Sequence, residues 1–212
     1  MAYELASSLK GTDSGEALFR LGLVRLNYLN DYEMAAKNFH TFTEKNRNDA
    51  KRADAIFNEA LCYYHSYYGG KEKHLSDAIR LFGEFFQSNK KHELAHVAQF
   101  YVGKLQHIRK DWSAAVKALE PLLGNKDPAL GQLVFLLGDS YHQKKQWEQS
   151  AKFYMQFAKG NEKALNADVA LHNAGVAYSN LKKPDNESAI AAYELLESKC
   201  PSSQHVPSAR LK

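Results

Sequence analysis

Residues 92–96 are the stretch of this sequence with the clearest potential for chemistry. Their order, His92-Glu93-Leu94-Ala95-His96, fits the pattern H-E-x-x-H. On a helix, this spacing puts two imidazoles on one face, where they can bind zinc, and it places a glutamate to activate a water molecule. Taken alone, the stretch therefore indicates zinc-dependent peptide hydrolysis.

The neighbouring residues do not complete such a site. A tetrahedral catalytic zinc needs a third protein ligand, and the longer form of the motif would supply it with glycine at position 99 and histidine at position 102. The chain has Gln99 and Val102 at these positions. Glu120 is a distant alternative ligand, but it is expected in the same short helix pair, which leaves little room for a substrate cleft.

We therefore interpret the stretch as the start of a structural unit, with His92 and Glu93 exposed and His96 beginning a helix. The chain also lacks a Gly-rich phosphate loop, a G-x-S-x-G elbow and a C-x-x-C pair. The sequence predicts a protein that is not an enzyme and that needs no metal or cofactor. A zinc peptidase built on His92, Glu93 and His96 is the alternative from a different functional class.

The composition is that of an ordinary globular chain of 212 residues, with 44% apolar and 25% charged residues and a formal net charge of +4. Basic residues are scattered along the chain, whereas a nucleic-acid-binding surface normally needs a concentrated basic footprint. No apolar run approaches the length of a membrane span, and no leader sequence is visible. Cys62 and Cys200 are expected to be too far apart to form a disulfide, and we interpret both as small apolar side chains.

The elements that would carry any site follow a repeated pattern. Small residues recur in a first predicted helix and again in a second one, and the spacing of the first set is close to a 34-residue period. The first set is Gly22, Ala60, Gly103, Gly138 and Gly175, and the second set is Ala35, Ala78, Ala115, Ser150 and Ala189.

Large apolar residues stand four and seven residues after each member of the second set. They are Phe39 and Phe42, Phe82 and Phe85, Leu119 and Leu122, Tyr154 and Phe157, and Tyr193 and Leu196. This spacing puts each pair on one helical face. A helix pair this short cannot bury its apolar stripe alone, so the pattern predicts neighbouring pairs stacked on one another.

The pattern resembles the tetratricopeptide repeat (TPR). The resemblance implies an all-α, right-handed α-solenoid of about five helix-turn-helix repeats, over residues 14–47, 50–88, 91–123, 128–160 and 163–200. Residues 1–13 would be an N-terminal extension, and residues 203–212 would start a partial C-terminal helix. We also predict helices over 32–45 and 187–199, with Asp111 as the N-cap of another helix.

The resemblance also implies a concave groove lined by first-helix residues. Carried over by position, the groove residues are Arg20, Asn58, Tyr64, Tyr101, Lys104, His107, Asp139, His142 and Asn173. Aromatic, amide and charged groups of this kind suit an extended or helical peptide. Leu23 and Lys104 depart from the carboxylate clamp of TPR proteins that bind chaperone tails, so binding of such tails is not expected.

A narrower resemblance concerns cellular role. The second-helix pattern and the segment from Cys200 through Val206 to Ala209 are similar to bacterial envelope TPR proteins related to BamD and CpoB. This resemblance implies a scaffold for a protein or peptide partner, in the periplasm or at the periphery of the outer membrane. A cytoplasmic scaffold or chaperone-like module is the alternative, and self-association through a terminal repeat stays open.

Overall fold

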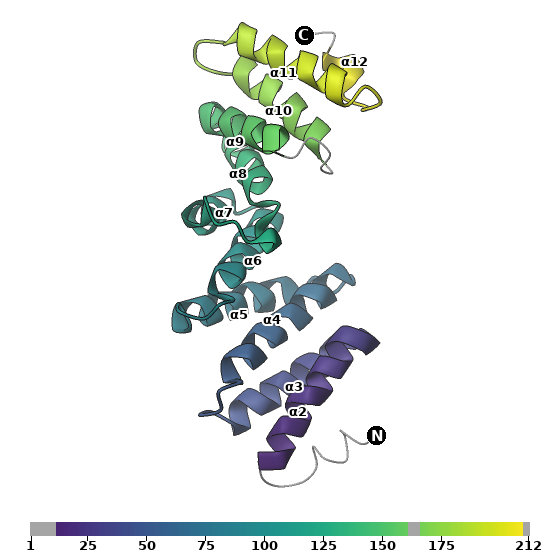
Figure 1. Ribbon diagram of the computed structural model, residues 1–212, viewed down its shortest axis with the longest axis vertical. Coiled ribbons are helices and arrows are strands. Elements are labelled where there is room, and N and C mark those ends of the chain that lie inside the picture. Colours follow the sequence, from purple (N-terminus) through teal and green to yellow (C-terminus); the bar gives the residue numbers. More distant parts are fainter. Residues whose placement is uncertain (1–11, 161–165, 210–212) are drawn as a thin grey trace. The chain divides into compact units, whose positions relative to one another are not determined.

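The computed structural model describes residues 12–160 and 166–209, and the regular structure of these residues is helical, without a strand (Figure 1). The predicted extension 1–13 lies outside the described residues except for its last two, which begin the first helix. The helices are α2 (Thr12–Val24), η1 (Arg25–Leu29), α3 (Tyr32–Lys45), α4 (Arg52–Tyr68), α5 (His74–Ser88), α6 (Ala95–Ile108), α7 (Trp112–Leu119), η2 (Glu120–Leu122), η3 (Pro128–Leu130), α8 (Leu133–Gln143), α9 (Trp147–Gly160), α10 (Ala167–Ser179), α11 (Asn186–Lys199) and α12 (Val206–Ala209).

The chain forms two compact units, Met1–Leu105 and Gln106–Lys212, whose boundary falls within α6. In unit 1, α2 packs on α3, α3 on α4, and α4 on α5. In unit 2, α7 packs on α8, α8 on α9, α9 on α10, and α10 on α11. From α2 to α5 and from α7 to α11, each α-helix thus packs on the next one in the chain, which is the arrangement of an α-solenoid built from helix pairs. The predicted fold class is confirmed.

The recurring residues form the core of both units. All ten large apolar residues of the second-helix pattern are buried, and none of them is more than 7% exposed. In the first repeat, the Phe19 ring packs against the rings of Phe39 and Phe42, with centroids 5.7 and 5.4 Å away. Phe57 and Phe135 make the corresponding ring contacts in their own repeats. The repeated aromatic position therefore holds the two helices of a pair together.

Three of the recurring glycines allow this close packing. A Cβ atom added to Gly22 would lie 2.8 Å from the Phe39 ring, and one added to Gly175 would lie still closer to the Tyr193 ring. Gly138 faces Tyr154 in the same way, at 2.9 Å. Contacts below 3.0 Å are too short for real Cβ atoms, so the second-helix aromatic ring sits directly on the glycine backbone.

The predicted helix limits are largely confirmed. α3 covers 32–45 as expected, α11 begins one residue early, and Asp111 caps α7 by accepting a hydrogen bond from the Ala114 N–H at 3.1 Å. The C-terminal helix differs, because it begins at Val206 and not at 203. The Ser203 hydroxyl donates to Asp168 at 2.7 Å and accepts from the His205 N–H at 3.2 Å, so this residue stays in the preceding turn.

The end of the first helix was not predicted. Residues 25–29 form a π-helical segment, which closes at Asn30 with a φ of 52°. The Arg25 side chain leaves this segment to donate to Asn38 Oδ1 on α3, at 2.5 Å. Tyr28 and Leu29 are pushed outward and are 80% and 62% exposed. Wider helical turns of this kind are uncommon, and they occur often at functional sites.

Candidate functional site

Unit 1 carries an aromatic cluster on the first helices of its repeats, which we call the tyrosine surface. It consists of Tyr64 and Tyr68 on α4 and of Tyr101 and Lys104 on α6. The Tyr64 ring centroid lies 4.9 Å from that of Tyr68 and 4.9 Å from that of Tyr101. Tyr68 is 55% exposed, while the other three are half-buried. The surface joins three of the predicted groove residues, namely Tyr64, Tyr101 and Lys104.

The tyrosine surface is anchored to the core of unit 1. The Tyr101 ring stacks on Phe82, with centroids 4.7 Å apart and an interplanar angle of 9°. Phe82 is fully buried and packs against Phe57 of the same helix pair. Because Tyr101 also holds Tyr64 through an edge contact, the rings are held in place before any ligand binds. Rigid aromatic side chains of this kind lose little conformational entropy on binding.

The polar atoms of the tyrosine surface act as hydrogen-bond donors at neutral pH. Lys104 Nζ donates to the Tyr64 hydroxyl oxygen at 2.9 Å. Burial raises the pKa of Tyr64 and Tyr101, and burial together with neighbouring tyrosines raises the pKa of Tyr68 to about 12. All three phenols are therefore protonated near pH 7, and the surface combines three O–H groups with one ammonium.

Unit 2 joins another set of predicted groove residues in a hydrogen-bonded network, which we call the polar chain. His107 Nε2 lies 2.6 Å from Asp139 Oδ2. The Tyr154 hydroxyl donates to Asp139 Oδ1 at 2.9 Å and accepts from Asn173 Nδ2 at 3.1 Å. The Asn173 Oδ1 atom in turn lies 3.3 Å from His172 Nδ1. The polar chain thus links α6, α8, α9 and α10 through side chains alone.

The electrostatics of the polar chain stabilise a charged Asp139. Burial would raise the pKa of this carboxyl group, but hydrogen bonds from His107 and Tyr154 outweigh burial and lower it. His142, one turn further along α8, lies beside Trp147 with ring centroids 5.1 Å apart. Burial lowers the pKa of His142 more than the nearby Asp139 carboxylate raises it, so the imidazole is neutral at pH 7.

Two predicted groove residues bind within their own helices. Arg20 is exposed and its Nε lies 2.6 Å from Glu16, one turn earlier on α2. The Asn58 Nδ2 donates to the backbone oxygen of Asp54 at 2.9 Å, within α4. Neither residue joins the tyrosine surface, although both lie on first helices as expected.

Sequence reasoning assigned some of the participating residues only to the core. Tyr154 belongs to the large apolar residues of the second-helix pattern, and it is fully buried, yet its hydroxyl is central to the polar chain. The corresponding residues of the first three repeats, Phe39, Phe82 and Leu119, have no hydroxyl. A tyrosine at a position where these repeats have phenylalanine or leucine was the sequence signal that could have pointed to the role of Tyr154. Tyr68 was missed because it lies at the end of α4, two turns beyond the recurring small residue Ala60.

The H-E-x-x-H stretch does not have the geometry of a helical zinc site. α6 begins at Ala95, so His92 lies in the preceding turn and does not share a helical face with His96. His92 Nε2 lies 3.3 Å from Asp54 Oδ1, and its ring packs edge-on against Phe85. Among the described residues there is no group of three His, Cys, Asp or Glu side chains that could hold a metal ion.

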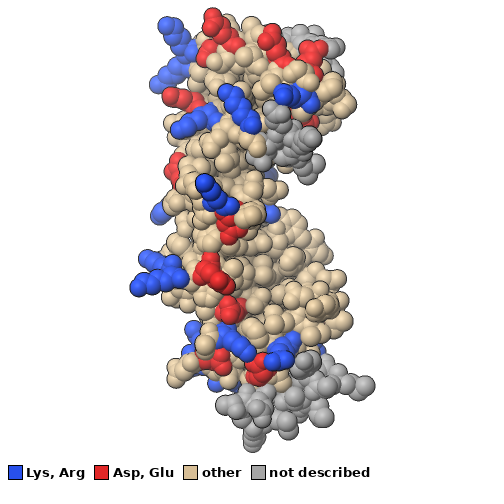
Figure 2. Space-filling view, viewed as in Figure 1, with Lys and Arg blue, Asp and Glu red and all other residues tan. Residues whose placement is uncertain are grey.

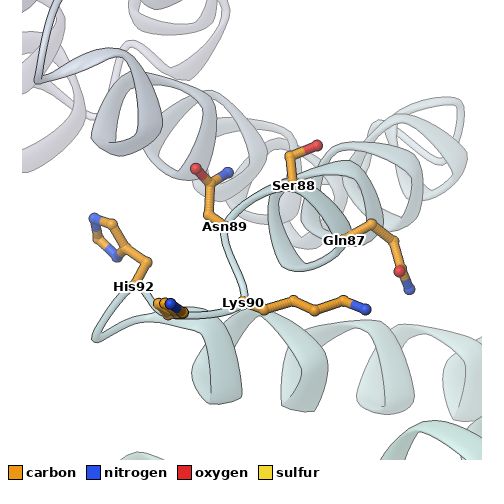
Figure 3. A pocket seen from close by; sticks show the side chains of 6 residues that line it. Gln87, Ser88, Asn89, Lys90 and His92 are labelled. Atoms are coloured by element: carbon orange, nitrogen blue, oxygen red, sulfur yellow. The ribbon is translucent and has the colours of Figure 1, made fainter.

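The same turn and the end of α5 line an open pocket, which Figure 3 shows from close by. Its lining residues are Gln87, Ser88, Asn89, Lys90, Lys91 and His92. In Figure 3, the side chains of His92 and Lys90 point in opposite directions, and that of Asn89 points to a third side. Since these polar groups do not converge on one point, the pocket offers no preformed site for a small ligand.

The surface charges are mixed. On the face seen in Figure 2, acidic and basic side chains alternate over the described parts, without a large patch of one sign. None of the helices within 12–160 and 166–209 is long and apolar enough to cross a bilayer. A phosphate-backbone footprint would require clustered Lys and Arg side chains, which this face does not show.

The consecutive helix pairs, in which a second-helix ring packs on a small first-helix residue, have the fold of a TPR-type α-solenoid. Residues 16–49, which cover the first helix pair, match the tetratricopeptide repeat family. No curated protein sequence matches the chain at a significant level.

Solved structures share the fold over nearly the whole chain. The crystal structure of MamA protein is 14% identical, with a TM-score of 0.69 over 89% of this chain and 93% of that one. The C-terminal part of a TPR repeat-containing protein from Cytophaga hutchinsonii is 16% identical, with a TM-score of 0.67 over 94% and 73%. The TPR-like repeats of a putative kinesin light chain from Podosopora anserina are 13% identical, with a TM-score of 0.60 over 92% and 99%. At these identities, the likeness concerns the fold alone.

Proposed function

We propose that this protein is a non-catalytic scaffold that binds a partner polypeptide through the first-helix side chains of unit 1. The observation that carries the proposal is the tyrosine surface, where a half-exposed Tyr68 ring stands beside rings that are anchored to the core. Tyrosines contribute a large contact area and a polar tip, and they are enriched where proteins bind one another. TPR folds generally mediate contacts between proteins, which agrees with this proposal.

The polar chain of unit 2 is less suited to bind a partner. The His107 and Asp139 side chains are only 18% and 21% exposed, and their polar atoms bind one another. A partner would have to break these hydrogen bonds to use the same atoms, and buried polar atoms left without a partner are costly. The polar chain therefore supports the structure of unit 2, while the tyrosine surface offers free donors and ring edges.

For the cellular role, we propose a bacterial envelope assembly, in the periplasm or at the outer-membrane periphery. The support is the sequence pattern from Cys200 through Val206 to Ala209 together with the second-helix aromatic stripe. A cytoplasmic scaffold is the alternative. Cell fractionation of the native organism, with antibody detection of the chain, separates the two placements. Recovery of the protein in the cytoplasmic fraction alone would contradict the envelope role.

Site-specific photo-cross-linking tests the scaffold function and locates the binding face. A photoreactive amino acid replaces Tyr68 in one variant and Arg80 in the other. Arg80 is the matched control, because its side chain is also 55% exposed but lies on α5, a second helix. In extracts of the native organism, the variant at position 68 should cross-link to a partner polypeptide and the variant at position 80 should not.

The opposite results would contradict the proposal. Cross-linking from position 80 alone would place the partner on the second helices, and no cross-linked product from either position would argue against a partner in unit 1. Zinc analysis of the purified protein addresses the enzyme alternative. Stoichiometric zinc that is lost in His96→Ala would favour the peptidase.

A further inference from the structure

We propose that the partner segment bound by the tyrosine surface is an acidic peptide, in which a side-chain carboxylate of Asp or Glu binds Lys104 beside an apolar side chain. This inference rests on the proposed function and specifies the partner's chemistry. It follows from the unused donors around Lys104, from the charges near them, and from the shape of the ring cluster.

The donors at the tyrosine surface exceed its acceptors. Lys104 has three N–H donors, and one of them is used by the Tyr64 hydroxyl oxygen. The Tyr64 hydroxyl accepts that bond through its oxygen, so the bond does not use the Tyr64 O–H proton. Two N–H groups of Lys104 and the O–H group of Tyr64 are therefore left for an external acceptor. A carboxylate has two oxygens and accepts from both kinds of donor.

Lys104 has no ion pair with a described carboxylate, in contrast to Lys51 and Lys71 of the same unit. Lys71 Nζ lies 2.6 Å from Glu33, and Lys51 forms an ion pair with Glu16. In the described part of the chain, no carboxylate pairs with Lys104; its one polar contact is a neutral phenol. Lys104 is half-buried, and its Nζ lies 5.4 Å from the Tyr64 ring centroid. The effective dielectric constant beside the protein is lower than in water, so the attraction of Lys104 for an external carboxylate is strengthened.

The rings fix where the neighbouring part of the peptide binds. Tyr68 is more than half exposed, and its ring packs against Tyr64 and Tyr67 with centroids 4.9 and 5.4 Å apart. An apolar or proline side chain next to the carboxylate can pack on the exposed ring of Tyr68, while the carboxylate binds Lys104. Because Tyr101 is stacked on the buried Phe82, the surface is organised in advance and little entropy is lost on binding.

Single-stranded nucleic acid is the other macromolecule that combines anions with stacking groups, and the surface fits it less well. Stacked bases need open ring faces, whereas Tyr64 meets Tyr101 edge-on at an interplanar angle of 69°, and Phe82 covers one face of Tyr101. A nucleic-acid backbone also needs several cations in a row, and the tyrosine surface has a single lysine.

The test is a selection of short random peptides displayed on phage, carried out on the full chain, on Lys104→Gln and on Lys37→Gln. Lys37 is the matched control, since it is exposed on α3, a second helix. Peptides selected by the wild type and by Lys37→Gln should be enriched in Asp or Glu next to Pro, Leu or an aromatic residue. Selection on Lys104→Gln should lose the acidic enrichment. Far-ultraviolet circular dichroism checks that each variant is folded.

A selected peptide and its Asp→Asn or Glu→Gln analogue then give the size of the effect. By fluorescence anisotropy, the amide analogue should bind the wild type about five- to tenfold more weakly, as expected for a partly exposed charge pair. Both peptides should bind Lys104→Gln equally, because the double change removes the same interaction.

Three outcomes would overturn the inference. Selected peptides that lack acidic residues but need Tyr68 would reject the acidic partner and leave the scaffold function in place. If the full chain selected no peptide, the acidic-peptide inference would fail, while the cross-linking from position 68 would still decide the scaffold function separately. Binding of an oligothymidine that is lost in Tyr68→Ala, without selection of acidic peptides, would assign the surface to nucleic acid.

Discussion

Replacing Tyr154 by phenylalanine removes one oxygen atom from the centre of the polar chain and keeps the buried ring. Asp139 then loses one of its donors, and Asn173 Nδ2 loses its acceptor. A hydrogen bond to a charged group contributes about 1.5–3 kcal/mol to stability. Relief of the buried hydroxyl offsets part of this loss, so we expect Tyr154→Phe to lower the free energy of unfolding by about 2 kcal/mol at pH 7.

The matched control is Tyr193→Phe, at the same position of the next repeat. The Tyr193 hydroxyl is buried, and no described residue has the distance and angle of a hydrogen bond to it. Ser179 lies near it, but the Ser179 proton goes to the backbone oxygen of Gly175 at 3.0 Å. Removing the Tyr193 hydroxyl should therefore change stability by less than about 0.5 kcal/mol or increase it. Urea unfolding followed by circular dichroism measures both variants.

The dependence on pH gives the prediction its second test. The folded-state pKa of Asp139 lies below its unfolded value of about 3.9, so the carboxylate contributes stability above that pH. This contribution is lost as pH falls through the folded pKa. The decrease in the free energy of unfolding caused by Tyr154→Phe should thus be largest at neutral pH and should become smaller below about pH 4. Equal effects of Tyr154→Phe and Tyr193→Phe, or a deficit that is unchanged in acid, would refute the role assigned to the polar chain.

Two further predictions concern packing and thiol reactivity. Gly175→Ala should lower the melting temperature, because the added Cβ would clash with Tyr193 at a cost of about 1–3 kcal/mol. The control is Gly83→Ala, whose Cβ would meet nothing within 4 Å and which should raise stability by about 0.5–1 kcal/mol. Equal melting temperatures of the two variants would contradict the close packing of Gly175 on Tyr193. Burial raises the pKa of both thiols, but Cys62 is fully buried and Cys200 is not, so a thiol reagent should modify Cys200 first and Cys62 only on unfolding. Rapid modification of Cys62 in the native protein would contradict this order.

The repeat architecture was predictable because it depends on residue size at fixed spacing. A small residue on one helix and a large ring on the next are both needed where two helices cross closely, and this requirement returns in every repeat. The pair Gly138 and Tyr154 shows the relation directly. The π-helical segment 25–29 was not predictable, since the Arg25 side chain binds Asn38 on another helix and local sequence does not encode that contact.

The candidate site was predictable only in outline. Helical periodicity placed Tyr64, Tyr101 and Lys104 on first helices, and they do meet in the tyrosine surface. Periodicity does not determine which partner a side chain selects. Asn58 turns back to the backbone of its own helix, because an acceptor one turn away is always within reach.

The polar chain also determines how far the repeats of unit 2 can be exchanged. Repeat proteins tolerate duplication and reordering of repeats when each repeat contacts its neighbours only through a packed interface of the same shape. Here, an imidazole from one module, a carboxylate and a phenol from the second, and an amide from the third satisfy one another. A recombined array that kept any two of these modules without the third would lose at least one of these hydrogen bonds. An engineered array of these repeats should therefore keep His107, Asp139, Tyr154 and Asn173 together.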